Sequence, residues 1–513
     1  MKKRNISFVI SNVVFFAILA KLAGFFREIA LSYCFGASGV SDAYLISQTI
    51  PGTVFQFVGV GINTCFIPIY YAVLKNDDDT IEYTNSILSI ILAFSAFVVA
   101  ITWLFTPIVV KVFASGFEGE TLYYAIWFTR ISITLLFFST TISVYISYLN
   151  ANKMFAVTAF SVIPYNVLVI VSIFLGAKIN IWLMSVGSVL SAGIQLLFLA
   201  YFLNKTQYKV GFYRKKDYKY TRQFIKLLAP VLIGVSISEV NTLVDRSIAS
   251  LISVGGISAL TYANSLVIFI QGILVQPIIT VFYPRLAESV TSGSVSEARN
   301  TLNRVIKLML GLLVPITVGY CVLSEPLTKI AFSRGAFDEN AIRMTSISVF
   351  FYALSICFVG IRELLSRYYY ACSDTKIPMI NSTIGVIINI LFNLLLSRLI
   401  GIAGLPLATT FSAITTSVLL LICLQKKSEG EISLDIKELF KVLFSSVVMG
   451  VVVYLINRFT PGGILLSFLS STVVGIIIYF SIGFVLKIEI ASFLIDNFAK
   501  KIIARKNERS KSD

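Results

Sequence analysis

The stretch VFASGFEGETLYYAIWFTRISI at residues 112–133 is paralleled by IAFSRGAFDENAIRMTSISVFF at residues 330–351. Further along, SYLNANKMFAVTAFSVIPYNVLVIVSIFL at 147–175 is paralleled by RYYYACSDTKIPMINSTIGVIINILFNLL at 367–395. The offset stays near 220 residues, as in the match of Phe117 with Phe337. These two pairs predict an internal duplication, in which one fold is built from two copies of a smaller one.

Long apolar stretches surround the duplicated segments. Hydrophobic residues make up 57% of the 513 and charged residues only 13%, a composition that excludes an ordinary soluble domain. Because a membrane-spanning helix needs about 20 mostly apolar residues, we predict an all-α polytopic membrane protein with about 14 transmembrane helices. The predicted spans are 6–26, 43–72, 85–110, 122–149, 155–176, 181–203, 225–250, 258–283, 304–323, 344–370, 378–399, 403–424, 440–458 and 463–486.

The distribution of basic residues predicts the orientation of these spans. With both termini in the cytoplasm, the cytoplasmic segments hold 30 of the 42 Lys and Arg residues and the opposite loops hold eight. This bias follows the positive-inside rule. The net charge of +16 is therefore mostly cytoplasmic anchoring, and nucleic acid is not an expected partner.

Each copy of the duplication holds six spans, so both copies share one orientation. We predict two parallel six-helix lobes, 1–204 and 225–425, joined by a basic cytoplasmic linker at 205–224. Two additional transmembrane helices (426–486) and a basic cytoplasmic tail (487–513) follow. Two parallel lobes are typical of alternating-access transporters.

Catalytic and cofactor motifs are not found in the sequence. It contains no histidine, no P-loop and no Ser/His/Asp pattern, and its six cysteines lack metal-binding spacing. We predict a protein that is not an enzyme, binds neither nucleotide nor cofactor, and works as a monomer.

Four basic residues lie in the interior of apolar stretches, away from the ends of the predicted spans: Lys21, Arg130, Arg246 and Arg362. A charge at the bilayer centre costs about 2.5–3.5 kcal/mol, so such residues normally face a protein interior or a hydrated cavity. Arg27 closes the first apolar stretch, six residues after Lys21. The two side chains point about 120° apart around a helix and can line one broad cavity.

Three segments together resemble the MurJ/MviN family of the multidrug/oligosaccharidyl-lipid/polysaccharide exporter superfamily. The first is LAGFFREIALSYCFGASGVSDAYLISQTIPG at 22–52. The second is LVDRSIASLISVGGISALTYANSLVIFIQGILVQPIITVFYPRLAE at 243–288. The third is SRGAFDENAI at 333–342, followed by IRELLSRYYYACSDTKIPM at 361–379.

The resemblance implies a flippase that carries undecaprenyl-pyrophosphate-linked peptidoglycan precursor, lipid II, from the inner to the outer leaflet of the bacterial cytoplasmic membrane. It implies that Lys21, Arg27 and Asp42 line the substrate cavity. Near Asn264, where the family commonly has a cation, the sequence is neutral. A flippase for another polyprenyl-linked oligosaccharide, such as a capsule or O-antigen unit, is the alternative, followed by a cation-coupled drug antiporter.

The remaining polar groups within the spans are candidates for coupling and gating. Oxygen ligands on facing helices suit Na⁺, and the family is similar in having a proposed cation site there; the alternative is ordinary hydrogen bonding between helices. Arg246 is a further candidate substrate contact, beside the possible coupling residue Asp245, and Arg130 receives no assignment. The candidates for ion coupling are Asp245, Asn389, Asn393 and Thr409, and those for structural or gating roles are Glu28, Arg362, Glu363 and Asp374.

Overall fold

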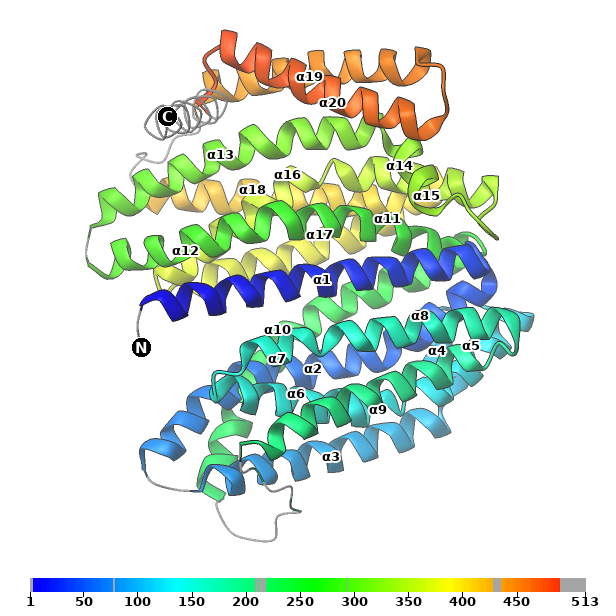
Figure 1. The fold of residues 1–513 in the computed structure, drawn as a ribbon, viewed down its shortest axis with the longest axis vertical. Helices are drawn as coiled ribbons and strands as arrows, with labels where there is room; N and C mark the ends of the chain where they lie inside the picture. Colours follow the sequence, from blue (N-terminus) through cyan, green and yellow to red (C-terminus); the bar gives the residue numbers. More distant parts are fainter. Residues whose placement is uncertain are drawn as a thin grey trace, which may run out of the picture. The chain divides into compact units, whose positions relative to one another are not determined.

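The structure is a computed structural model that describes residues 3–76, 79–206, 208, 211, 218–292, 294–427 and 435–489. Within these ranges the chain is helical and contains no β-strand (Figure 1). It divides into two compact units, which are described separately below. The first takes in the described residues up to Ser265 together with Arg334–Ala341, and the second takes in Leu266–Ser333 and the described residues from Ile342 onward.

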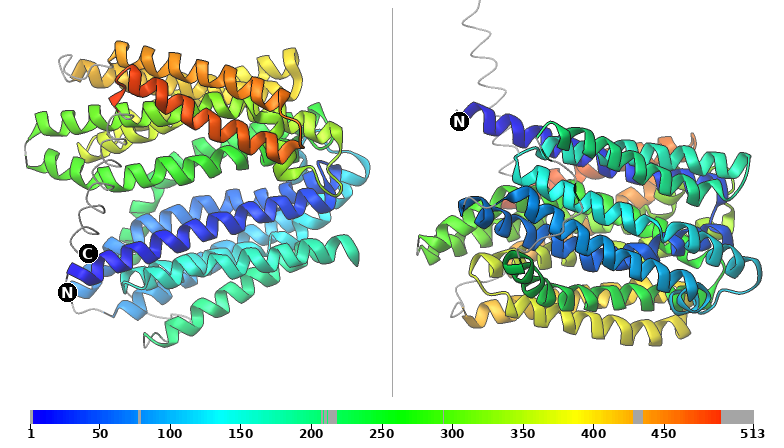
Figure 2. Two further views of the ribbon diagram at one scale, coloured as in Figure 1. Left: turned by 45° about the horizontal axis from the view of Figure 1, so that its top comes forward. Right: turned by 90° about the horizontal axis from the view of Figure 1, so that it is seen from below.

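The helices of the first unit form a bundle whose core lies among α2, α3, α6 and α9. Figure 2 shows α1, in dark blue, as one unbroken helix. The helices are α1 (Lys3–Phe35), α2 (Gly39–Lys75), α3 (Thr80–Leu104), α4 (Thr106–Phe113), α5 (Gly119–Ser132), α6 (Leu135–Ala151), α7 (Phe155–Phe160), α8 (Val162–Lys178), α9 (Leu183–Asn204), α10 (Tyr218–Ile252) and α11 (Gly256–Ile270).

The second unit has its main core among α12, α13, α16 and α18. A π-helical turn, η1, joins it to α11. Its elements are η1 (Gln271–Val275), α12 (Gln276–Thr291), α13 (Val295–Val322), α14 (Ser324–Phe332), α15 (Glu339–Ala353), α16 (Ile356–Ala371), α17 (Lys376–Ile400), the 3₁₀ turn η2 (Gly401–Ala403), α18 (Gly404–Lys427), α19 (Ile436–Phe459) and α20 (Ile464–Val485).

Each predicted span coincides with one helix or with a run of consecutive helices. Among the described residues, nine helical segments are long and apolar enough to cross a membrane, or eleven if each of two bent pairs counts as one span. One of the nine, Lys376–Lys426, contains both α17 and α18, whereas α1 and α10 are not among them. The all-helical, multi-pass class is confirmed, and the count of fourteen stays a prediction.

The duplication is visible as matching backbone irregularities. The helix pair α5–α6 bends by 41° and the pair α15–α16 by 44°. Lys153 and Ser373, 220 residues apart, end α6 and α16 with positive φ angles of 63° and 59°. Such angles are uncommon outside glycine, so their recurrence at the sequence offset supports two copies of one fold.

The first unit runs past the predicted linker and includes α10 and part of α11. The predicted lobe boundaries therefore stay a prediction. Most of the basic linker, at 207, 209–210 and 212–217, and the tail from 490 lie outside the described residues.

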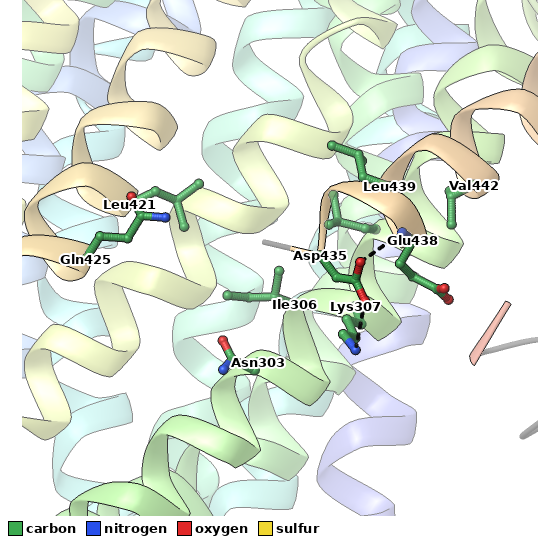
Figure 3. A pocket seen from close by; sticks show the side chains of 10 residues that line it. Asn303, Ile306, Lys307, Leu421, Gln425, Asp435, Glu438, Leu439 and Val442 are labelled. Atoms are coloured by element: carbon green, nitrogen blue, oxygen red, sulfur yellow. Dashed lines mark hydrogen bonds and ion pairs between the residues drawn. The ribbon is translucent and has the colours of Figure 1, made fainter. Parts of the chain in front are cut away.

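The two additional helices, α19 and α20, lie side by side and α19 packs on α13 (Figure 1). The hydroxyl of Tyr479 donates to the carbonyl of Gly311 at 2.5 Å, which ties α20 to α13. Near the start of α19, the ammonium of Lys307 lies 3.8 Å from the Asp435 carboxylate (Figure 3). It also lies 3.4 Å from the carboxylate of Glu489. These contacts fix the extra helices to the second unit.

Candidate functional site

Asp42 lies in the first turn of α2 and is 1% exposed. Its carboxylate accepts three hydrogen bonds, from the backbone N–H of Gly255 at 2.8 Å and from the N–H and hydroxyl of Ser258, both at 2.7 Å. Asp42 thereby caps the start of α11, where free N–H groups favour a negative charge. In this conformation the buried Asp42 holds two loops together, and its place in the substrate cavity, implied by the family resemblance, stays a prediction.

Two glycines make this approach possible. Gly36 and Gly255 adopt φ angles of +63° and +80°, which favour glycine, and a Cβ on Gly255 would collide with the carbonyl of Ala37. The carbonyl of Gly36 accepts a hydrogen bond from the Tyr262 hydroxyl at 3.1 Å. The loop before α2 and the loop before α11 are therefore in direct contact.

Two further loops join the same contact. The N–H of Ala336 donates to the carbonyl of Tyr33 at 2.9 Å, and the rings of Tyr262 and Phe337 lie 5.9 Å apart. The N–H of Gly116 donates to the Ser250 hydroxyl at 3.0 Å. We call the four segments 33–42, 115–117, 247–262 and 334–337 the interlock. They include parts of all three resemblance segments and lie at loops predicted to face away from the cytoplasm.

Arg246 strengthens the interlock from within α10. Its guanidinium donates to the carbonyl of Ile257 at 3.2 Å and to the hydroxyl of Thr261 at 2.5 Å. The neighbouring Asp245 accepts from the amide of Asn241 at 3.4 Å. Arg246 thus joins α10 to α11, and its predicted contact with substrate stays a prediction.

The basic residues of α1 are accessible to different degrees. Lys21 is exposed. The side chain of Arg27 is 35% exposed and pairs at 2.8 Å with Glu28, which is 10% exposed. Because α1 continues to Phe35, this pair lies inside the helix and not at its end. A cation that is accessible within a span requires water or an anion beside it.

The predicted coupling residues are divided between the two units. Asn393 donates to the amide oxygen of Asn389 at 2.7 Å, and Asn389 donates to the Thr409 hydroxyl at 3.2 Å, linking α17 to α18 in the second unit. Asp245 belongs to the first unit. In the part of the chain that the structure describes, no cluster of three His, Cys, Asp or Glu residues could hold a metal ion.

The adjacent residues Arg362 and Glu363 on α16, predicted to have structural or gating roles, do not form an ion pair with each other. Glu363 accepts a hydrogen bond from the amide of Gln276 at 2.6 Å and lies 4.0 Å from the guanidinium of Arg367. Across the described residues Arg362 has no ion pair within 4.0 Å. Asp374 accepts from the N–H of Ile377 at 3.2 Å, at the start of α17.

Two features were missed by sequence reasoning. The guanidinium carbon of Arg130 lies 5.2 Å from the ring centre of Trp103 and 4.8 Å from that of Trp127. These cation–π contacts stabilise the charge within its predicted span. Trp127 is three residues from Arg130, a helical spacing that could have indicated the contact. The second feature is an apolar cavity of about 330 Å³ among α13, α19 and α20, lined by residues such as Pro315, Tyr320 and Phe468.

A duplicated all-helical bundle with cations inside its predicted spans is an arrangement typical of membrane transporters. A solved structure titled as the lipid II flippase MurJ in an inward closed conformation matches 92% of this chain and 98% of its own, with a TM-score of 0.80 and 24% identity. An inward-facing multidrug transporter of the MATE family matches 80% and 95%, with a TM-score of 0.67 and 12% identity. These likenesses define the fold.

The family is identified by sequence. The model of the lipid II flippase MurJ family matches residues 31–475. A probable lipid II flippase MurJ from Thermotoga maritima is 27% identical over 470 residues, covering 92% of this chain and 94% of the relative. One from Rickettsia prowazekii is 25% identical over 492 residues, covering 93% and 97%. The chain belongs to the lipid II flippase MurJ family.

Proposed function

We propose that this chain moves lipid II from the inner to the outer leaflet of a bacterial cytoplasmic membrane. The match of the family model over residues 31–475 carries the proposal. The accessible Lys21 and Arg27 on α1 support it, because a pyrophosphate that crosses hydrocarbon needs cationic, hydrated surroundings.

The apolar cavity of the second unit suits part of the isoprenoid tail. Its lining is almost entirely apolar, with Thr472 among the few polar side chains. Lipid chains are as apolar as these residues, so the tail gains little free energy by entering. We propose that the cavity orients the tail while the head group moves, and that it contributes little to affinity.

The interlock represents the closed state of one end in an alternating-access cycle. Opening that end would break the three hydrogen bonds to Asp42, each worth about 1.5–3 kcal/mol for a charged acceptor. We further propose that both termini are cytoplasmic, as the charge bias indicates, and that a monomer works without nucleotide.

Na⁺ is the proposed coupling ion. The amide and hydroxyl oxygens of Asn389, Asn393 and Thr409 are linked to one another in the second unit, and hard oxygen donors fit an alkali cation. Replacement of Na⁺ by choline on both sides of the membrane should slow flipping. An unchanged rate would remove Na⁺ from the mechanism.

The direct test is flipping in proteoliposomes. Lipid II with a fluorescent head group is reconstituted with the purified chain, and an impermeant reductant then destroys the dye in the outer leaflet. Vesicles without protein should lose about half of the signal, since half of the lipid faces outward, whereas an active flippase exposes the remainder. A parallel sample with an undecaprenyl-linked capsule oligosaccharide tests the alternative substrate class. Loss of only half the signal with lipid II would refute the proposal.

A further inference from the structure

The helix α16 carries a polar side in a region that sequence places within a span. Ile361, Leu364 and Leu365 are buried in the core of the second unit, where α16 packs against α13 and α18 (Figure 1). The opposite side presents Arg362, Glu363 and Ser366, all half-buried, followed by the exposed Arg367 and Tyr370. A lipid-facing surface within a span would be apolar, so we infer that this side of α16 faces the protein interior or a hydrated space and not lipid.

The acid on this surface is already occupied. Glu363 accepts the Gln276 amide at 2.6 Å and has Arg367 at 4.0 Å. Gln276 directly follows the π-helical turn η1, and π-turns occur frequently at functional sites. One carboxylate and two guanidinium groups leave this surface with one excess positive charge.

Arg362 carries that excess. Its side chain makes no ion pair within 4.0 Å and donates no hydrogen bond within the described ranges. The other two arginines predicted inside spans are engaged, since Arg130 stacks on two tryptophans and Arg246 donates to α11. Of the four cations singled out in the predicted spans, Lys21, Arg130 and Arg246 lie in the first unit and Arg362 lies in the second.

A guanidinium offers five donors in a planar fork that matches two oxygens of a phosphate. We propose that Arg362 is an anion-binding residue of the second unit that takes a phosphate of the polyprenyl-pyrophosphate substrate, with Gln276 and Arg367 holding Glu363 away from it. The inference rests on the proposed function and adds a substrate contact to it.

The test compares binding of undecaprenyl pyrophosphate with that of undecaprenol, which has the same tail and no phosphate. Full-length chains in lipid nanodiscs are titrated with each ligand. In Arg362→Gln the Kd for the pyrophosphate should rise at least about tenfold, which equals about 1.4 kcal/mol, while the Kd for undecaprenol stays unchanged. Arg362→Lys should recover part of the affinity. Arg130→Gln, which removes an equal charge from a different span, is the matched control and should bind both ligands as the wild type does.

Two results would contradict a role of Arg362 in phosphate binding. Equal pyrophosphate affinity in Arg362→Gln and wild type would overturn it, as would an equal loss of both ligands, which would indicate general unfolding. The proposed function is tested separately by lipid II flipping. A wild type that flips, beside an Arg362→Gln variant that flips equally fast, leaves the function standing and rejects the role of Arg362.

Discussion

At the scale of single residues, Asp42 controls the interlock. In Asp42→Asn the carboxylate is replaced by an amide with one acceptor oxygen, so the three donors from Gly255 and Ser258 cannot all be satisfied. Each lost charged hydrogen bond costs about 1.5–3 kcal/mol. We expect the interlock to open and the nearby Cys34 thiol, half-buried in α1, to react faster with an impermeant maleimide added from outside.

Asp79→Asn is the matched control for that experiment. Asp79 also accepts two backbone hydrogen bonds, as the N-cap of α3, and Asn is an equally good N-cap. Its labelling rate should equal that of the wild type. An unchanged Cys34 rate in Asp42→Asn would show that this carboxylate does not hold the interlock closed.

Arg27 combines two roles that a pair of substitutions separates. Arg27→Ala removes a cation from α1 and leaves Glu28, largely buried, without its 2.8 Å partner. Because Arg27 is partly exposed, breaking this pair costs less than the about 3–5 kcal/mol of a fully buried pair, and both stability and flipping should fall. Arg27→Lys keeps the charge and should retain stability and part of the flipping rate. Full flipping by Arg27→Ala, measured at equal protein level in proteoliposomes, would remove Arg27 from the substrate path.

At the scale of elements, the turn before α11 depends on glycine. In Gly255→Ala, the positive φ of 80° costs an L-residue about 1–2 kcal/mol, and the new Cβ would also displace the carbonyl of Ala37. We expect a lower midpoint of thermal unfolding. Gly52→Ala, inside α2 with open space around its Cα, should raise it slightly, since Gly in a helix costs about 0.5–1 kcal/mol relative to Ala. A Gly255→Ala variant as stable as the wild type would contradict the turn geometry.

The start of α19 depends on the charge of Asp435. The N–H of Glu438 donates to this carboxylate, and together with the charge of Lys307 it lowers the pKa of Asp435 below its ordinary value of 3.8. A lowered pKa means that the stabilisation is complete above pH 3.8 and is lost as the pH falls through the folded value. Asp435→Ala should speed hydrogen exchange over residues 436–442 at pH 7, whereas Asp435→Asn, which keeps the capping oxygen and loses only the charge, should speed it less. Equal exchange in all three chains would exclude this cap.

Helix positions followed from hydropathy, but helix breaks did not. The break between α3 and α4 at Phe105 separates two apolar segments, so hydropathy does not mark it, although Pro107 in the first turn of α4 is a sequence signal for a helix start. The bends of 41° in α5–α6 and 44° in α15–α16 also lie between apolar segments. Hydropathy reports where a chain prefers lipid, and it contains no information on the angle between two equally apolar turns.

At the scale of the whole molecule, residue types were easier to predict than their partners. Asp42 was identified from its segment, yet its partners lie 213 and 216 residues further along the chain, and only the fold brings them together. The predicted ion-coupling residues give a second example: the sequence grouped Asp245 with Asn389, but the two residues belong to different units of the structure. The sequence identified the charged residues, and the structure shows that Asp42 and Arg246 form hydrogen bonds that hold helices together.

The interlock gives the most direct test of alternating access. The hydroxyls of Ser115 and Ser247 lie 2.9 Å apart, so cysteines at both positions would bring their sulfur atoms close enough to test for a disulfide. Oxidised Ser115→Cys/Ser247→Cys should stop flipping, because the interlock can no longer open, and a reductant should restore it. Ser95→Cys/Thr140→Cys joins α3 and α6, whose hydroxyls lie 3.2 Å apart, inside one bundle. This control should flip when oxidised, because no opening of the interlock requires α3 and α6 to separate. A cross-linked interlock that still flips at the wild-type rate would mean that transport proceeds without opening this end.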